Sequence, residues 1–302
     1  MAVKYTVSEF KNFGKCVCID NGAMELYVTV DIGPRIIKLN LKGKDNMMFC
    51  DESRSILRDA SVVSDMFGEG SVWYIYGGHR FWLSPEKYPE TYYPDNEPVT
   101  YIVDGNKFTF HAPKQRFTGW QESMILEVDE NDAKVSVKHV LVNMSDRTQK
   151  ASVWGIKVTD KGGVAYIKQA KEDTGLLSNR NLVVWPYSDL TDNRFCMDNE
   201  YFILKQDTKA KNAFKFGTNN TNGVTLCVNH ETVFKITAEY VKGAEYPDYG
   251  SSSELYSCAD FLEVETLSPL YTLKPGEVCE HVEKWELIPE KSTDFDKLKR
   301  YF

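Results

Sequence analysis

The segment Phe261–Thr266 reads Phe-Leu-Glu-Val-Glu-Thr and carries the clearest structural signal in the chain. Apolar and polar side chains alternate along it, which is the period of a β-strand. As a strand, it places Leu262 and Val264 on one face. Glu263 and Glu265 then lie on the other face, with their carboxylates about 7 Å apart.

This pair of carboxylates has two interpretations. Carboxylates at such a spacing can take a proton from one hydroxyl group or accept hydrogen bonds from several, which points to a polyol or a sugar. The same pattern is also typical of a half-solvated antiparallel strand, whose glutamates face water while its apolar side chains face the core. Both interpretations make the segment a strand.

The same two-residue period recurs along the chain and predicts an all-β protein. Turn signals such as Asn-Gly and Pro-Gly separate the alternating segments, which is typical of a large antiparallel β-sandwich with few short helices. No linker or repeat divides the chain, so we expect residues 1–302 to form a single domain. Helix is expected only at residues 53–67 and 292–302. Strands are expected at residues 16–19, 24–30, 36–41, 123–128, 134–142, 151–159, 201–205, 224–228, 234–240, 261–266 and 281–287.

Charge and composition exclude several classes of function. The chain carries 36 basic and 44 acidic side chains, a net charge of −8, and no basic run long enough to follow a phosphate backbone. We therefore expect neither nucleic acid nor a membrane as a partner. No window has the pattern of a signal peptide or a membrane span, so a cytoplasmic protein is expected. The seven cysteines lack the spacing of a zinc site, and no pattern calls for a metal or another cofactor.

Residues 73–99 combine aromatic, proline and charged residues without regular alternation, and we expect a long functional loop there. Gly77 and Gly78 allow a close approach of the backbone just before His79 and Arg80. Aromatic rings can cover the C–H face of a sugar, while arginine, histidine and carboxylates bind its hydroxyl groups. The alternative is that Trp82 and the other rings pack beneath a surface loop.

A second segment, residues 179–194, has a similar composition. An apolar strand ends there in residue types that suit a ligand, namely Trp185, Tyr187, Asp189 and Arg194. These side chains are expected to line the same cleft as Arg80 and Trp82. Alternatively, the Trp-Pro pair ends an edge strand.

Four short motifs resemble those of the galactose mutarotase-like β-sandwich proteins, which include aldose 1-epimerases and hexose-6-phosphate epimerases. Residues 137–147 resemble the family's central strand and its Asn-x-Ser-Asp turn, and residues 151–159 resemble the next strand. Residues 273–277, Leu-Lys-Pro-Gly-Glu, are similar to its closing turn. Residues 261–263 are similar to the strand that bears the epimerase base. The resemblance therefore implies a supersandwich fold in which Glu263 is the general base.

One difference from the family affects the chemistry. The epimerases carry a histidine acid on the strand after the Asn-x-Ser-Asp turn, and here that place reads Val-Trp-Gly-Ile-Lys at residues 153–157. Mutarotation needs an acid as well as a base. Histidine can donate a proton near neutral pH, so His79 is the expected substitute acid.

These observations lead to two expected functions. The first is an aldose 1-epimerase-like isomerase that acts on a sugar or sugar derivative, as a monomer or a homodimer, with Glu263 as base and His79 as acid. The second is a non-catalytic carbohydrate-binding or regulatory protein on the same fold. The expected substrate-binding residues are Arg80, Trp82, Glu265, Trp185, Tyr187, Asp189 and Arg194.

Overall fold

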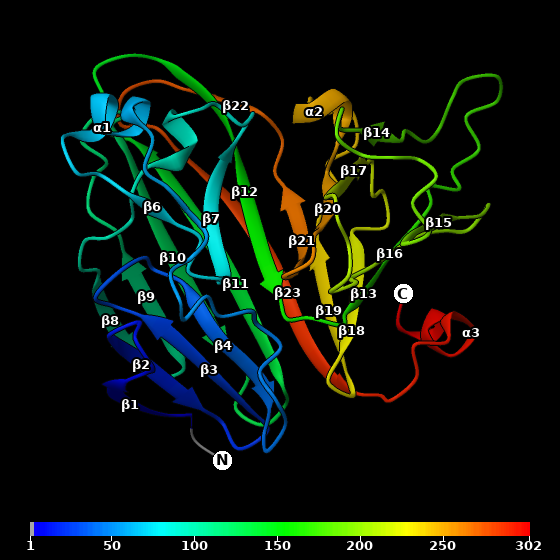
Figure 1. Cartoon of the computed structure of the whole chain (residues 1–302), viewed down its shortest axis with the longest axis horizontal. Helices are drawn as coiled ribbons and strands as arrows, with labels where there is room; N and C mark the ends of the chain where they lie inside the picture. Colours follow the sequence, from blue (N-terminus) through cyan, green and yellow to red (C-terminus); the bar gives the residue numbers. More distant parts are fainter. Residues whose placement is uncertain (1–2) are drawn as a thin grey trace.

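Two large antiparallel β-sheets pack against each other in the structure (Figure 1). The computed structural model describes residues 3–302. Side chains from both sheets fill the space between them, for example Leu26 and Ile36 from one and Phe108, Met124 and Trp285 from the other. The sequence prediction of a large antiparallel β-sandwich is therefore confirmed.

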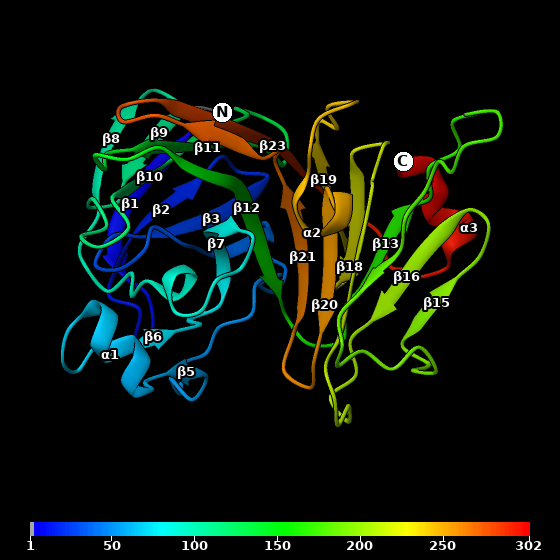
Figure 2. The ribbon, with the colours of Figure 1, turned by 90° about the horizontal axis from the view of Figure 1, so that it is seen from above.

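The first sheet contains strands from both halves of the chain (Figure 2). In spatial order its strands are β1 (Lys4–Glu9), β2 (Lys15–Asp20), β3 (Met24–Thr29), β4 (Ile36–Leu41), β7 (Gly78–Ser84), β12 (Gln149–Thr159), β21 (Leu262–Leu267), β20 (Ser253–Ser257), β17 (Phe214–Thr218) and β14 (Val183–Val184), with β22 (Tyr271–Leu273) also paired to β12.

The second sheet covers one face of the first. In spatial order its strands are β15 (Phe195–Met197), β16 (Tyr201–Lys205), β13 (Val164–Lys168), β18 (Val224–Asn229), β19 (Thr232–Ala238), β23 (Val278–Pro289), β11 (Lys134–Asn143), β10 (Trp120–Val128), β9 (Lys107–His111) and β8 (Thr100–Asp104). A small separate sheet pairs β5 (Leu57–Arg58) with β6 (Trp73–Tyr74).

Helices are few and short, as predicted. They are α1 (Ser61–Phe67), α2 (Pro247–Gly250) and α3 (Phe295–Leu298), with 3₁₀ turns η1 (Glu90–Tyr92) and η2 (Lys299–Tyr301). The helix expected over residues 53–67 occupies only the second half of that range, because residues 57–58 pair with β6 instead. None of the helices in residues 3–302 is long and apolar enough to span a membrane.

The expectation of a long loop at residues 73–99 is wrong in its centre. Gly78–Ser84 forms β7, which pairs with β12 from Gly78 to Ser84 in the middle of the first sheet. The alternation along β7 is hidden in the sequence because a histidine points to the interior while Arg80 and Trp82 point outward. The strand was missed for that reason.

Two glycines allow β7 to enter the sheet. Gly77 and Gly78 have φ values of +98° and +66°, in the region that favours glycine. A Cβ atom on Gly78 would collide with the carbonyl oxygen of Ile36, and one on Gly77 with that of Phe49. The close backbone approach expected from the sequence is therefore present.

Replacing Gly78 by alanine is expected to destabilise the fold by at least about 2 kcal/mol, through backbone strain and the collision with Ile36. Gly43→Ala is the matched control, because Gly43 also has a positive φ, +77°, but has no atom within 4 Å of an added Cβ. Urea unfolding of both variants measures the difference. Equal losses in the two would show that the close approach does not matter.

Candidate functional site

Neighbouring strands of the first sheet bring distant parts of the sequence together on one face. The register places Lys215 of β17 beside Tyr256 of β20, and Tyr256 beside Glu263 of β21. Trp82 of β7 lies beside Trp154 of β12. Paired residues of an antiparallel sheet point to the same side. These side chains lie on the face turned away from the second sheet, which we call the outer face.

A pocket of about 380 Å³ opens on the outer face, and we call it the outer pocket. Strand residues form one part of its wall, and segments outside the sheet form the rest. The wall is rich in aromatic rings and carries charges of both signs. Its residues are Ile56, Arg58, Trp73, Ile75, Arg80, Trp82, Glu86, Tyr92, Trp154, Trp185, Tyr187, Ala213, Lys215, Tyr256, Phe261 and Glu263.

Two carboxylates line this pocket, and Glu263 is the buried one while Glu86 is exposed. Glu263 is 7% exposed, and its Oε1 accepts a hydrogen bond of 3.0 Å from Nη2 of Arg80. The Arg80 guanidinium lies 4.3 Å from the ring of Trp82, while its Nε and Nη1 have no hydrogen-bond partner in the described structure. Arg80 therefore has two donors without a hydrogen-bond partner beside Glu263, and both are buried.

A second ion cluster lies next to this pair. Nζ of Lys215 is 2.7 Å from Oε2 of Glu254 and 3.0 Å from Oε2 of Glu265. Trp154 donates its indole N–H to the same Glu265 oxygen at 2.7 Å. The Lys215 ammonium also lies 4.5 Å and 4.7 Å from the rings of Trp154 and Trp185. Lys215 is thus held between carboxylates and aromatic rings at the pocket wall.

Burial and charge shift the pKa values of these groups. Burial raises the pKa of Glu263, Arg80 opposes that shift, and Glu265 adds to it. Burial also raises the pKa of Glu254 well above its usual range. Burial lowers the pKa of Lys215, but Glu254 and Glu265 outweigh it and hold that pKa well above its usual value. The buried carboxyl groups are those of Glu254, Glu263 and Glu265, and the cations beside them are Arg80 and Lys215. Because carboxyl groups outnumber cations, the cluster favours keeping one carboxyl group protonated.

Strand β21 is buried on both faces, from Leu262 to Leu267. The interpretation of this segment as a half-solvated strand is therefore wrong. Segments outside the sheet, including Trp73 and Trp185, cover the outer face that would otherwise face water. Glu265 lies beneath this cover, fully buried, and does not line the outer pocket.

His79 does not lie with Glu263. It is fully buried between the two sheets, where its Nε2 is 2.8 Å from Nε2 of His139. Adjacent residues of a strand point to opposite faces, so Arg80 on the outer face places His79 on the inner one. Burial lowers the pKa of His79 well below its usual value, and His139 lowers it further. The pairing of His79 with Glu263 across a cleft is not found.

Asp189 and Arg194 also lie outside the outer pocket and line a different one. Asp189 accepts hydrogen bonds from the backbone and hydroxyl of Thr191, which stabilises a turn. Arg194 is held by Asp192 at 2.7 Å. Of the predicted binding residues, the structure brings Arg80, Trp82, Trp185 and Tyr187 to the pocket with Glu263.

Sequence reasoning missed Lys215, Glu254, Trp154 and Tyr256. The sequence does carry a signal for Lys215, which stands between two phenylalanines in the segment Phe214–Thr218. If this segment is a strand, alternation puts the phenylalanines on one face and the lysine on the other. The other three stand in segments that look like ordinary strands. Their importance depends on which strands become neighbours, and the sequence does not encode that locally.

One group in the described part of the chain has the ligand types of a metal site: His79, His139 and Glu283, whose ligand atoms lie within 4.8 Å of one another. Glu283 already contacts the Lys157 ammonium and accepts an indole N–H from Trp285 at 2.8 Å. A metal there would have to displace Lys157. We therefore describe this inner group as a hydrogen-bonded ion cluster.

Comparison of the sequence with protein-family models and with curated proteins finds no match. Several solved structures nevertheless resemble the whole chain. A galactose mutarotase-like protein from Lactobacillus casei superposes with a TM-score of 0.57 at 10% identity, over 90% of this chain and 100% of its own. A candidate aldose 1-epimerase from Klebsiella pneumoniae gives 0.60 at 13%, over 99% and 85%.

A TPR-domain containing protein from Parabacteroides distasonis gives a TM-score of 0.62 at 12% identity. The match covers 93% of this chain but 48% of that protein, so this chain spans about half its length. The chain therefore has the galactose mutarotase-like fold, as its motifs led us to expect. At these identities, what the site does has to be argued from its own residues.

Proposed function

We propose that the outer pocket binds an aldose or a related sugar derivative and interconverts its anomers, with Glu263 as the base. The observation that carries this proposal is the position of Glu263, a carboxylate 7% exposed in the wall of a tryptophan-rich pocket. Aromatic rings suit the C–H face of a pyranose, and the guanidinium of Arg80, which lines the same pocket, suits its oxygens.

The chemistry assigns a definite task to Glu263. Its carboxylate takes the proton of the anomeric hydroxyl, the C1–O1 bond becomes a carbonyl, and the bond between C1 and the ring oxygen breaks. Lys215 gives one of its ammonium protons to the ring oxygen, and the reverse steps on the other face of C1 return both protons and give the other anomer. A carboxylate whose pKa is raised by burial is a stronger base for the first step.

Lys215 replaces His79 in this proposal as the group that faces the ring oxygen. It lines the outer pocket, and its Nζ is fixed by Glu254 and Glu265. Because its pKa lies well above the usual value, Lys215 gives up its proton less readily than a histidine would. We therefore expect slower catalysis than a carboxylate–histidine pair would give.

The anomerisation rate is expected to rise with pH through the pKa of Glu263. Only the ionised carboxylate can accept the proton, so the rate should increase about tenfold per pH unit below this pKa and then level off. Burial places the midpoint above that of an ordinary glutamate. Rates measured from pH 4 to pH 8 test this, and a profile that falls as pH rises would contradict it.

The second candidate function is sugar binding without catalysis. It is favoured by the ion pair between Glu263 and Arg80, because a bound guanidinium makes a carboxylate a weaker base. The high pKa of Lys215 also favours sugar binding without catalysis, because it makes the ammonium group a weak acid. The same pocket would then serve as a binding site whose affinity rests on its rings and on Arg80.

Exchange NMR of anomeric protons separates the two functions. Glucose, galactose, mannose and glucose 6-phosphate would each be measured with the protein and in buffer alone. We expect at least one to interconvert faster with the protein. Binding of a sugar without faster exchange would support the second function, and the absence of both binding and faster exchange would contradict the proposal.

A further inference from the structure

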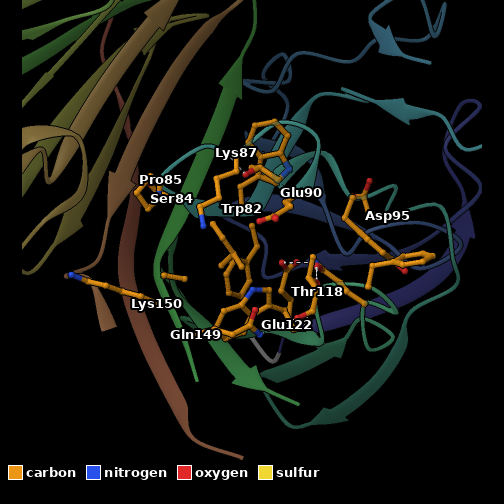
Figure 3. Close-up of a pocket in the computed structure, with 18 of the residues that line it drawn as sticks. Trp82, Ser84, Pro85, Lys87, Glu90, Asp95, Thr118, Glu122, Gln149 and Lys150 are labelled. Atoms are coloured by element: carbon orange, nitrogen blue, oxygen red, sulfur yellow. Dashed lines mark hydrogen bonds between the residues drawn. The ribbon is translucent and has the colours of Figure 1, made fainter. Parts of the chain in front are cut away.

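A second pocket, of about 90 Å³, lies at the open edge of β7, and we call it the edge pocket (Figure 3). β7 pairs with β12 along its length but with β4 only at Ile36 and His79. Beyond His79, no strand in residues 3–302 pairs with this edge of β7, and the segments around Tyr93 and Phe117 line the pocket beside it. The volume is several times what one water molecule needs, so the pocket can take a small molecule.

Glu122 places a carboxyl group at an interior position of this pocket. Along β10, the side chains of Trp120, Met124 and Leu126 point to the core and are buried. The two-residue period puts Glu122 on that same face. In Figure 3 its side chain lies among the residues that line the pocket. Glu122 itself is half-buried, so its carboxyl group can be reached from the pocket while the strand shields part of it from water.

The neighbours of Glu122 orient it without neutralising it. Gln115 donates its side-chain N–H to Oε1 of Glu122 at 3.0 Å, and Thr118 fixes the Gln115 amide by donating to its oxygen at 2.5 Å. No hydrogen bond from the described residues reaches Oε2 of Glu122. The amide network therefore holds one carboxylate oxygen and leaves the other available to the pocket.

No described cation lies within ion-pair distance of Glu122. The nearby Asp95 is occupied by Arg35, which donates to both of its oxygens at 2.8 Å and 3.0 Å. Burial and, to a smaller extent, Asp95 raise the pKa of Glu122 to about 8, although Arg35 and the hydrogen bond from Gln115 oppose that shift. The other charged residues that line the pocket are Lys87, Glu90, Arg147 and Lys150.

We propose that the edge pocket binds a small organic ammonium ion, with Glu122 as its counter-charge. The ammonium supplies the missing partner of the carboxylate, and the rings of Phe81, Tyr93 and Trp120 suit the C–H groups around a cation. A divalent metal fits less well, because it needs more oxygen ligands than one free carboxylate offers. When Glu122 is protonated, binding releases its proton to solvent.

The probes that test this are isopropylammonium and ethanolammonium, each compared with its neutral hydroxyl isostere: isopropanol and ethylene glycol. Calorimetry at pH 6 and pH 8 measures affinity, and two buffers of different ionisation enthalpy measure proton release. We expect at least one ammonium probe to bind at least tenfold more tightly than its isostere. Its affinity should rise between pH 6 and pH 8, with a proton released at the lower pH.

Glu122→Gln keeps the shape of the side chain and removes its charge, so it should weaken ammonium binding at least tenfold. Glu127→Gln is the matched control, on the same strand but on its exposed face, and should bind as the wild type does. Equal binding of an ammonium and its isostere, unchanged affinity in Glu122→Gln, or no binding by any probe would overturn the proposal. The isostere and pH comparisons use wild-type protein, so they decide even if the variant fails to fold.

Discussion

Replacing Lys157 by methionine is expected to destabilise the protein by about 3–5 kcal/mol. Lys157 and Glu283 are both fully buried between the sheets and form an ion pair. Burial raises the pKa of Glu283, but Lys157 and the surrounding histidines outweigh it and hold that pKa well below its usual range. Removing Lys157 leaves a buried charge without its partner. Urea unfolding at neutral pH measures the loss.

Two further variants make this result specific. Lys161→Met removes a lysine whose ion pair with Asp260 is exposed, and it should cost at most about 1 kcal/mol. Adding Glu283→Gln to Lys157→Met removes the uncompensated charge and should recover part of the loss. A Lys157→Met variant within about 1 kcal/mol of the wild type would contradict the role of the inner ion cluster.

Replacing Glu263 by glutamine is expected to lower the anomerisation rate by about 100-fold or more, because the amide cannot accept the proton. Sugar affinity should change much less, since the rings of the outer pocket and Arg80 remain. Exchange NMR at saturating sugar measures the rate, and tryptophan fluorescence measures binding. The two readouts separate lost chemistry from lost binding.

Asp260→Asn is the matched control for this prediction. Asp260 is an exposed carboxylate in the same segment of the chain, and its ion pair with Lys161 lies outside the pocket. Its rate should stay within about twofold of the wild type, as is usual for a surface substitution. If Glu263→Gln anomerises the sugar as fast as this control does, Glu263 is not the base.

Much of the fold could be predicted because its strands obey a two-residue period. Ile36–Leu41 and Tyr201–Lys205 match the expected bounds, and most other expected strands differ only at their ends. β7 could not be recognised, because its interior face carries His79 and its outer face carries Trp82 and Arg80. Both faces of β7 are buried, so polarity does not alternate with exposure along it. Phe214–Thr218 is as long as Tyr201–Lys205, but the glycine within it weakens its strand signal.

The candidate site could be predicted only in part, for a related reason. Glu263 stands in a clear strand, so its position followed from local alternation. Whether it meets His79 or Lys215 depends on which strands become neighbours and on which face each side chain points to. The irregular composition of residues 73–99 hides the alternation that puts His79 and Arg80 on opposite faces, so the sequence predicts a His79–Glu263 pair that the structure does not bring together.

The most direct test of the outer pocket is a crystal structure of the protein with the aldose that exchanges or binds best. We predict a sugar ring against Trp82, Trp154 or Trp185, with its anomeric hydroxyl within hydrogen-bond distance of Glu263 and an oxygen near the guanidinium of Arg80. A sugar bound elsewhere, with the outer pocket empty of it, would contradict the proposed function.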